Sequence, residues 1–190
     1  MAGYDVVLFL HIAIAITGLM MAAVLHGSLF AMRSAHRAGE LKWWPHAIHR
    51  VEPLLPVAAL ALLGTGLWLL ALSDGEFAWN DPWVIASIVG LVVAEGIGAA
   101  LTPRSKALQK AIEAMPDDQE RGLPRPDALL WILSHTVTGL FFGVIFLMVT
   151  KPSAALSWTV LAIAAAVGAL TALPFAGTRS GKHAVIAASG

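Results

Sequence analysis

Four histidines and one glutamate interrupt segments of this sequence that are otherwise apolar. They are His11, His26, His49, Glu95 and His135, of which His49 lies near the start of its segment. An ionisable side chain at mid-depth in a bilayer costs roughly 3 kcal/mol, so it usually has a partner or a task. Imidazole and carboxylate groups bind haem iron and metal ions, and they also carry protons. These five residues are therefore the candidates for any chemistry.

The elements that position them are five apolar segments, each long enough to cross a bilayer, which takes about 20 helical residues. They lie near Tyr4–Met32, Pro45–Leu72, Pro82–Leu101, Ala128–Thr150 and Ala154–Phe175. Only 13% of the residues are charged, against about 25% in soluble domains. Lipid cannot satisfy an exposed backbone, so the spans are expected to be helical. We predict an all-α integral membrane protein with five transmembrane helices in a single domain, residues 1–190, and a bend at Pro53 and Pro56.

The basic residues predict how the chain is oriented. Eleven of the 12 lysines and arginines fall on one side, after the first span, after the third span and in the tail at Arg179 and Lys182, whereas Lys151 is on the other. The positive-inside rule then puts the N-terminus outside and the C-terminus in the cytoplasm. Residues 103–126 become a cytoplasmic loop, in which apolar residues at helical spacing predict a short amphipathic helix.

Small residues predict which spans pack together. Stripes of alanine and glycine at spacings of three or four residues occur in the first, third and fourth spans, for example at Gly90, Ala94 and Gly98 and at Gly139 and Gly143. Such stripes let helix backbones approach closely. The fifth span has no ionisable residue and no such stripe. We therefore expect a four-helix core with the fifth helix at its periphery.

The topology assigns a depth to each polar residue. His26, Glu95 and His135 are each seven or eight residues from the basic end of their spans, which is roughly 10–12 Å inside the boundary. Three helices therefore present polar groups to one layer. His11 lies in the other half of the membrane, about 60° around the helix from His26, so both can face the bundle interior.

Three chemistries fit this layer. His26 and His135 could be the axial ligands of a b-type haem, with His11 as a further ligand or as a polar contact to a quinone. A single zinc, copper or iron ion could instead bind His26, His135 and Glu95, together with His49 or Glu52. The same residues could also relay protons without a cofactor.

A non-enzymatic function is the remaining alternative. The chain could be a transporter, an assembly factor, a homo-oligomer or a subunit of a membrane complex that docks through residues 105–125. Its net charge of zero favours no nucleic-acid partner, and the lipid bilayer is the partner that its composition implies. The absence of cysteine excludes thiolate catalysis and cysteine-ligated iron–sulfur clusters.

Three stretches resemble a known group of proteins. The sequence from Leu10 to Ala15 continuing to Gly18, the pair Thr65-Gly66, and the stretch from Val144 to Pro152 are similar to small bacterial membrane proteins. These include the CopD-type copper-resistance proteins and the HemJ-type membrane protoporphyrinogen oxidases. The resemblance implies a four-helix core that holds haem b, with His11 as a ligand, in a redox protein of the bacterial inner membrane. The HemJ-type fourth helix carries Asn-Glu-x-Pro where this chain has Ser-His-Thr-Val from Ser134, so the uncharacterised relatives are more similar.

Overall fold

The computed structural model describes residues 2–176, and all of its regular structure is helical. The helices are α1 (Ala2–Ser34), α2 (Ala38–Leu41), α3 (Trp43–Val51), α4 (Leu54–Ala71), α5 (Pro82–Glu113), α6 (Ala128–Thr150) and α7 (Ala154–Ala176). Five segments of the described chain are long and apolar enough to span a membrane, the second of them formed by α2, α3 and α4 together. Large apolar side chains such as Phe9, Leu60 and Val149 are exposed on the surface of these segments, as lipid-facing residues are. The prediction of an all-helical, five-span protein is confirmed.

The second span is interrupted where prolines were expected to bend it. The helix ends at Val51 and begins again at Leu54, with Glu52 and Pro53 in a turn between α3 and α4. Proline has no backbone N–H and its ring clashes with the preceding turn, so the hydrogen-bond ladder breaks there. The break leaves Glu52 at the junction, where its side chain reaches Ser105 of α5, with its Oε2 accepting from the Ser105 hydroxyl at 3.5 Å.

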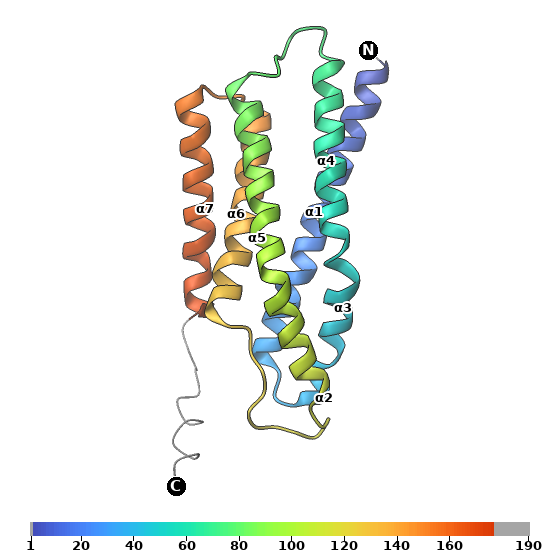
Figure 1. Ribbon diagram of the computed structural model, residues 1–190, viewed down its shortest axis with the longest axis vertical. Coiled ribbons are helices and arrows are strands. Elements are labelled where there is room, and N and C mark those ends of the chain that lie inside the picture. The colour runs from blue at the N-terminus through green and yellow to red at the C-terminus, as the bar shows by residue number, and fades with distance from the viewer. Residues whose placement is uncertain (1, 177–190) are drawn as a thin grey trace.

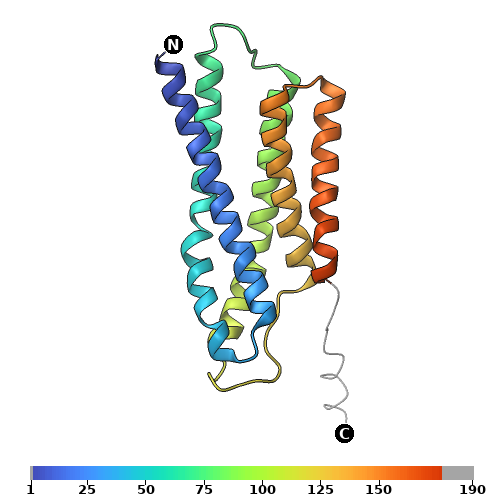
Figure 2. The same cartoon turned by 180° about the vertical axis from the view of Figure 1, so that it is seen from behind.

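The helices form two groups that lie side by side along the long axis (Figures 1 and 2). In one group, α1 packs along α3 and α4. In the other, α5 packs on α6, and α6 on α7. Direct contacts between the groups, such as those of α1 with α6 and of α4 with α5, are sparse in comparison. The space between the groups is therefore where the interior sites lie.

Helix α7 stands at the edge of the bundle (Figure 1), yet it makes the closest backbone contact with α6. A Cβ atom at Gly139 would lie 2.2 Å from the carbonyl oxygen of Ala164, and one at Gly168 would lie 2.4 Å from that of His135. Only glycine permits this approach. The glycines of the fourth span thus face α7, the span that we expected at the periphery of the core. The alanines and the single Gly168 of α7 provide a matching small surface.

The region after the third span differs from the expectation. Residues 103–113 do not form a separate amphipathic helix but continue α5 to Glu113, with Pro103 inside the helix. Part of the apolar face of this segment is covered by protein. Ile112 is fully buried in a cluster with Leu41 and Ile48, and Leu108 packs against it. Burial of this face against α2 and α3 explains why the helix continues past a proline.

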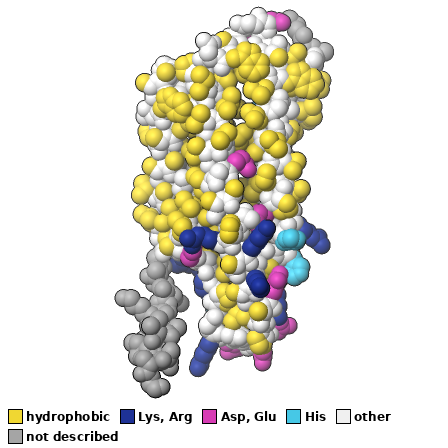
Figure 3. Space-filling view, viewed as in Figure 1, with side chains coloured by type: hydrophobic (Ala, Val, Ile, Leu, Met, Phe, Trp, Pro, Cys, Tyr) yellow, Lys and Arg dark blue, Asp and Glu magenta, His cyan; other side chains and the backbone are white. Residues whose placement is uncertain are grey.

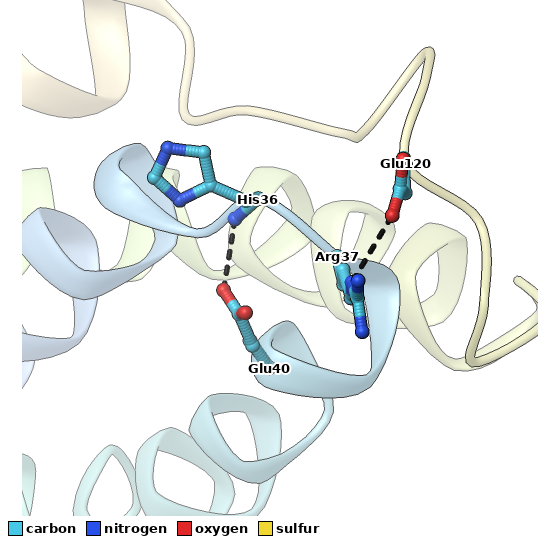
Figure 4. Close-up of polar contacts among 4 residues, drawn as sticks. All are labelled: His36, Arg37, Glu40 and Glu120. Atoms are coloured by element: carbon cyan, nitrogen blue, oxygen red, sulfur yellow. Dashed lines mark hydrogen bonds and ion pairs between the residues drawn. The ribbon is translucent and has the colours of Figure 1, made fainter.

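The connections at one end of the molecule bind each other closely, and we call this the basic end. The backbone N–H groups of Ala38 and Gly39 donate to the carbonyls of Gln119 and Asp117, at 2.9 and 3.0 Å. Arg37 forms an ion pair with Glu120 at 3.1 Å, and the Glu40 carboxylate accepts from the backbone N–H of His36 at 2.8 Å (Figure 4).

Arg125 adds a second tie at the basic end. Its guanidinium donates to the carbonyls of Met32, in the last turn of α1, and of Ala35, just after the helix. Carbonyls at the C-terminal end of a helix have no N–H partner within the helix, and Arg125 supplies one. On the face shown in Figure 3, lysine and arginine side chains gather toward this end together with acidic and histidine side chains, whereas yellow hydrophobic side chains predominate among the coloured ones farther up. That the basic end is cytoplasmic stays a prediction from charge, and Arg179 and Lys182 lie outside the described residues.

Candidate functional site

Two cavities lie one above the other between the two helix groups. The first, which we call the His11 cavity, has a volume of about 320 Å³ and is lined by α1, α4, α5 and α6. The second, the Glu95 cavity, has a volume of about 330 Å³, contains His26 in its lining and extends to the basic end. Both are lined in part by Leu62, Leu91 and Phe141. These three apolar side chains therefore form a layer between the two polar sites.

Two side chains contact the ring nitrogens of His11, which is 7% exposed. The hydroxyl of Thr65 lies 2.7 Å from the carbonyl oxygen of Ala61 and 2.8 Å from Nδ1 of His11. When this hydroxyl donates to Ala61, its oxygen accepts from Nδ1–H, and Nε2 of the neutral ring has a lone pair. In the other tautomer the hydroxyl donates to Nδ1, and Nε2–H donates to the sulfur of Met148.

The second ring nitrogen faces a group that has no proton. The Nε2 atom of His11 lies 3.5 Å from the sulfur of Met148, across the cavity on α6. A thioether accepts weakly and cannot donate. In the Nδ1–H tautomer a nitrogen lone pair and a sulfur lone pair face each other, and both kinds of atom can bind a metal. A Cβ atom at Gly66 would lie 3.3 Å from Cε1 of His11, so this glycine leaves room for the ring.

Two further polar groups line the His11 cavity. Ser87, on α5, is only 4% exposed. Its buried hydroxyl oxygen has no hydrogen-bond partner among the described residues. Such a group usually indicates an additional partner. Lys151 caps α6 in the left-handed conformation, with φ at 48°. Its ammonium lies 3.7 Å from the centre of the Phe77 ring, a cation–π contact at the end of the cavity that carries the N-terminus.

His26 and His135 come together from different helices, as their equal depth predicted. Their ring centroids are 4.6 Å apart and the rings meet edge to face. Each Nδ1 bonds the carbonyl four residues back, Ala22 at 2.9 Å and Trp131 at 3.0 Å. A carbonyl only accepts, so both Nδ1 atoms carry the proton. The Nε2 atom of His26 is buried and has no hydrogen-bond partner within residues 2–176.

This arrangement differs from a pair of axial haem ligands. Bonds of about 2.0 Å from a metal to each Nε2, on opposite faces of a macrocycle, would put the nitrogens about 4 Å apart. The ring centroids would then be farther apart than the 4.6 Å observed, and the rings would not touch each other. His26 and His135 thus contact each other instead of facing a common ligand from opposite sides.

The predicted metal site is not assembled in the structure. Within residues 2–176, no three histidine, aspartate or glutamate side chains gather closely enough to hold a metal ion. His49 is exposed on α3, away from the cavities, because α3 buries its opposite face through Pro45 and Ile48. Glu95 and Glu52 line the Glu95 cavity with His26, whereas His135 does not line it. The four proposed ligands, His26, His135, Glu95 and His49, are therefore not one coordination shell.

The fold and the two cavities define a multi-helix integral membrane protein with interior polar sites. A protein-family model described as "Predicted integral membrane protein (DUF2269)" matches residues 5–152, and the chain belongs to this family. The match covers the four spans that line both cavities and ends before α7. No curated protein and no solved structure was found to match the chain. The comparisons therefore identify the family, and they show no link to the CopD and HemJ groups.

Proposed function

We propose that this protein binds one b-type haem in the His11 cavity, with His11 as an axial ligand, and that it transfers electrons in the membrane. The observation that carries the proposal is the position of His11: its imidazole lines an apolar cavity of about 320 Å³, and its Nδ1 contacts the hydroxyl of Thr65 at 2.8 Å. Histidine is an axial ligand in many haem proteins. Met148 is not proposed as the second ligand, because its sulfur lies 3.5 Å from Nε2, whereas two axial ligands about 2.0 Å from one iron would be about 4 Å apart.

The hydrogen bond at Nδ1 supports this assignment. Histidine ligands usually donate their second ring N–H to a neighbouring acceptor, which fixes the tautomer and orients the ring. The Thr65 hydroxyl does this for His11 at 2.8 Å. Thr65 and His11 lie on adjacent helices, so the packing of α1 on α4 determines the orientation of the ligand.

The size and lining of the cavity favour haem over a bare ion. A single copper or zinc ion would need only a few close ligands, yet about 320 Å³ of space adjoins His11 and Met148. This volume falls within the range of about 300–1,000 Å³ of sites for organic ligands. Aromatic rings contribute to its walls, including those of Trp83 and Phe141.

The remaining polar residues have clear tasks under this proposal. A bound haem supplies one-electron chemistry, whose potential depends on axial ligands and burial. Lys151 provides a positive charge at one end of the cavity, where it can pair with a carboxylate group of the haem. Ser87 provides a hydroxyl that the protein itself leaves unpaired. Leu62, Leu91 and Phe141 separate this site from the Glu95 cavity.

Replacing Thr65 by valine tests the hydrogen bond to the ligand while keeping the shape of the side chain. We expect the variant to bind haem roughly 10- to 100-fold more weakly, which is the usual effect of removing such a partner. Purified protein would be titrated with haemin, and binding would be followed by the haem absorbance.

Thr159→Val is the matched control, because Thr159 is exposed on α7 and its hydroxyl bonds only the carbonyl of Ala155. This variant should bind haem like the wild type. Equal affinity of the Thr65→Val protein and the wild type would refute the role of Thr65, and no saturable binding of haemin by the wild type would refute the haem proposal.

A further inference from the structure

The Glu95 cavity is a second site, and most of its polar groups are hydrogen-bond acceptors. The polar groups come from α1, α5, α6 and the turn between α3 and α4: His26, Glu52, Glu95, Thr102, Ser105, Gln109, Ser134 and Thr138. No lysine or arginine of the described chain lines this cavity. The site therefore differs in charge from the His11 cavity, which includes Lys151.

Three hydroxyl groups in the lining donate their protons to groups of the protein itself. Thr102, Ser134 and Thr138 each donate to a backbone carbonyl of their own helix, at 3.3, 3.0 and 3.3 Å. A hydroxyl has one proton, so only its lone pairs remain for a ligand. One N–H of the Gln109 amide donates to Ser105 at 3.0 Å, so the second N–H of this residue, near the basic end, is the exception to the acceptor lining.

His26 and Glu95 leave the strongest acceptors without partners. The Nδ1–H group of His26 is bound to the carbonyl of Ala22, so the buried Nε2 can only accept, and it has no partner among the described residues. Glu95 makes no hydrogen bond or ion pair within residues 2–176, although it lies in the middle of a span. A carboxylate in this position is costly unless a cation or a donor pairs with it.

The rest of the cavity is apolar and far larger than an inorganic ion. Its volume is about 330 Å³, and leucines such as Leu19, Leu29 and Leu55 form much of the wall. The polar lining requires a group that is positively charged and rich in N–H donors, and the apolar wall requires a hydrocarbon portion. An alkyl ammonium ion has both.

We propose that the Glu95 cavity binds a lipophilic primary amine, with its ammonium group between the Glu95 carboxylate and Nε2 of His26. This site is independent of the haem site, because Leu62, Leu91 and Phe141 lie between the two cavities. A primary ammonium has three N–H donors, which matches a lining that offers acceptors.

The test uses the full chain in nanodiscs of phosphatidylcholine and radiolabelled octylamine as the probe, with empty nanodiscs as the blank. We expect saturable binding of one octylamine per chain. Octanol, which has the same chain without a charge, should compete about tenfold or more weakly. Binding no greater than that of empty nanodiscs, or equal competition by octanol, would overturn the proposal.

Glu95→Gln keeps the size of the side chain and removes its charge. This variant should bind octylamine about tenfold or more weakly. Glu113→Gln is the matched control, because it makes the same change at an exposed position on the same helix and should leave affinity unaltered. Undiminished binding by the Glu95→Gln protein would contradict the proposed site. If that variant does not fold, the comparison of octylamine with octanol on the wild type still decides the matter.

Discussion

The His11→Ala protein is expected to purify without haem under conditions in which the wild type retains it. The substitution removes the nitrogen ligand from the His11 cavity, and the described residues lining that cavity include no other histidine. Loss of a ligand should exceed the roughly 10- to 100-fold effect of losing its hydrogen-bond partner. We expect at least about a 100-fold loss of affinity, measured by titration with haemin.

Two other histidine variants make this result specific. His46→Ala removes an exposed imidazole of α3 that bonds the carbonyl of Lys42, and it should leave haem binding unchanged. His135→Ala changes the contact with His26 and should also retain haem, because His135 lines neither cavity. Retention of haem by His11→Ala together with its loss from His135→Ala would place the haem site at His26 and His135 instead of at His11.

The Gly139→Ala protein is expected to be strongly destabilised. A methyl group at this position would lie 2.2 Å from the carbonyl oxygen of Ala164, so α6 and α7 must separate. Both contact surfaces are backbone, which has little freedom to yield, and overpacking of this kind costs about 3 kcal/mol or more. Thermal unfolding of the detergent-solubilised protein, followed by tryptophan fluorescence, measures the loss.

Gly64→Ala is the control for this prediction. Within residues 2–176, no atom outside the adjoining turns of α4 lies within 4 Å of a Cβ at Gly64, which is exposed in the middle of this helix. Alanine is favoured over glycine in a helix by about 1 kcal/mol, so this variant should be as stable as the wild type or slightly more stable. If Gly139→Ala unfolds at the same temperature as Gly64→Ala, the close approach of α6 and α7 is refuted.

Hydropathy predicted the spans well because the bilayer fixes both the length and the composition of a helix that crosses it. The fourth span was expected at Ala128–Thr150, and α6 has those bounds. Asp127 begins this helix by accepting from the backbone N–H of Leu130, at 2.7 Å. The bend at Pro53 was also predictable, since proline acts locally on the backbone.

Contacts between spans were harder to predict, because apolar residues surround each helix and no polar face marks its neighbours. The length rule located the end of the third span near Leu101, but burial of Ile112 against α2 extends α5 further. The depth argument brought His26 and His135 together correctly. It could not show that their rings touch, because depth specifies neither the distance between helices nor the rotation of a side chain.

Three residues of the His11 cavity gave little or no signal in the sequence. Met148 is separated from His11 by 137 positions, and a methionine in a span usually serves packing. Ser87 is small and common in helices. Thr65 was noted only as part of the resemblance to other families, and its bond to His11 depends on the packing of α1 on α4. Only the three-dimensional arrangement identifies these residues as a group.

If His11 holds a haem iron, as we propose, the purified wild type will absorb light as a haem protein does. The protein would be produced in cells supplied with a haem precursor, and spectra would be recorded before and after reduction with dithionite. We expect a Soret band and a reduced α-band, with about one haem per chain. A colourless protein that also fails to bind added haemin would refute haem ligation by His11.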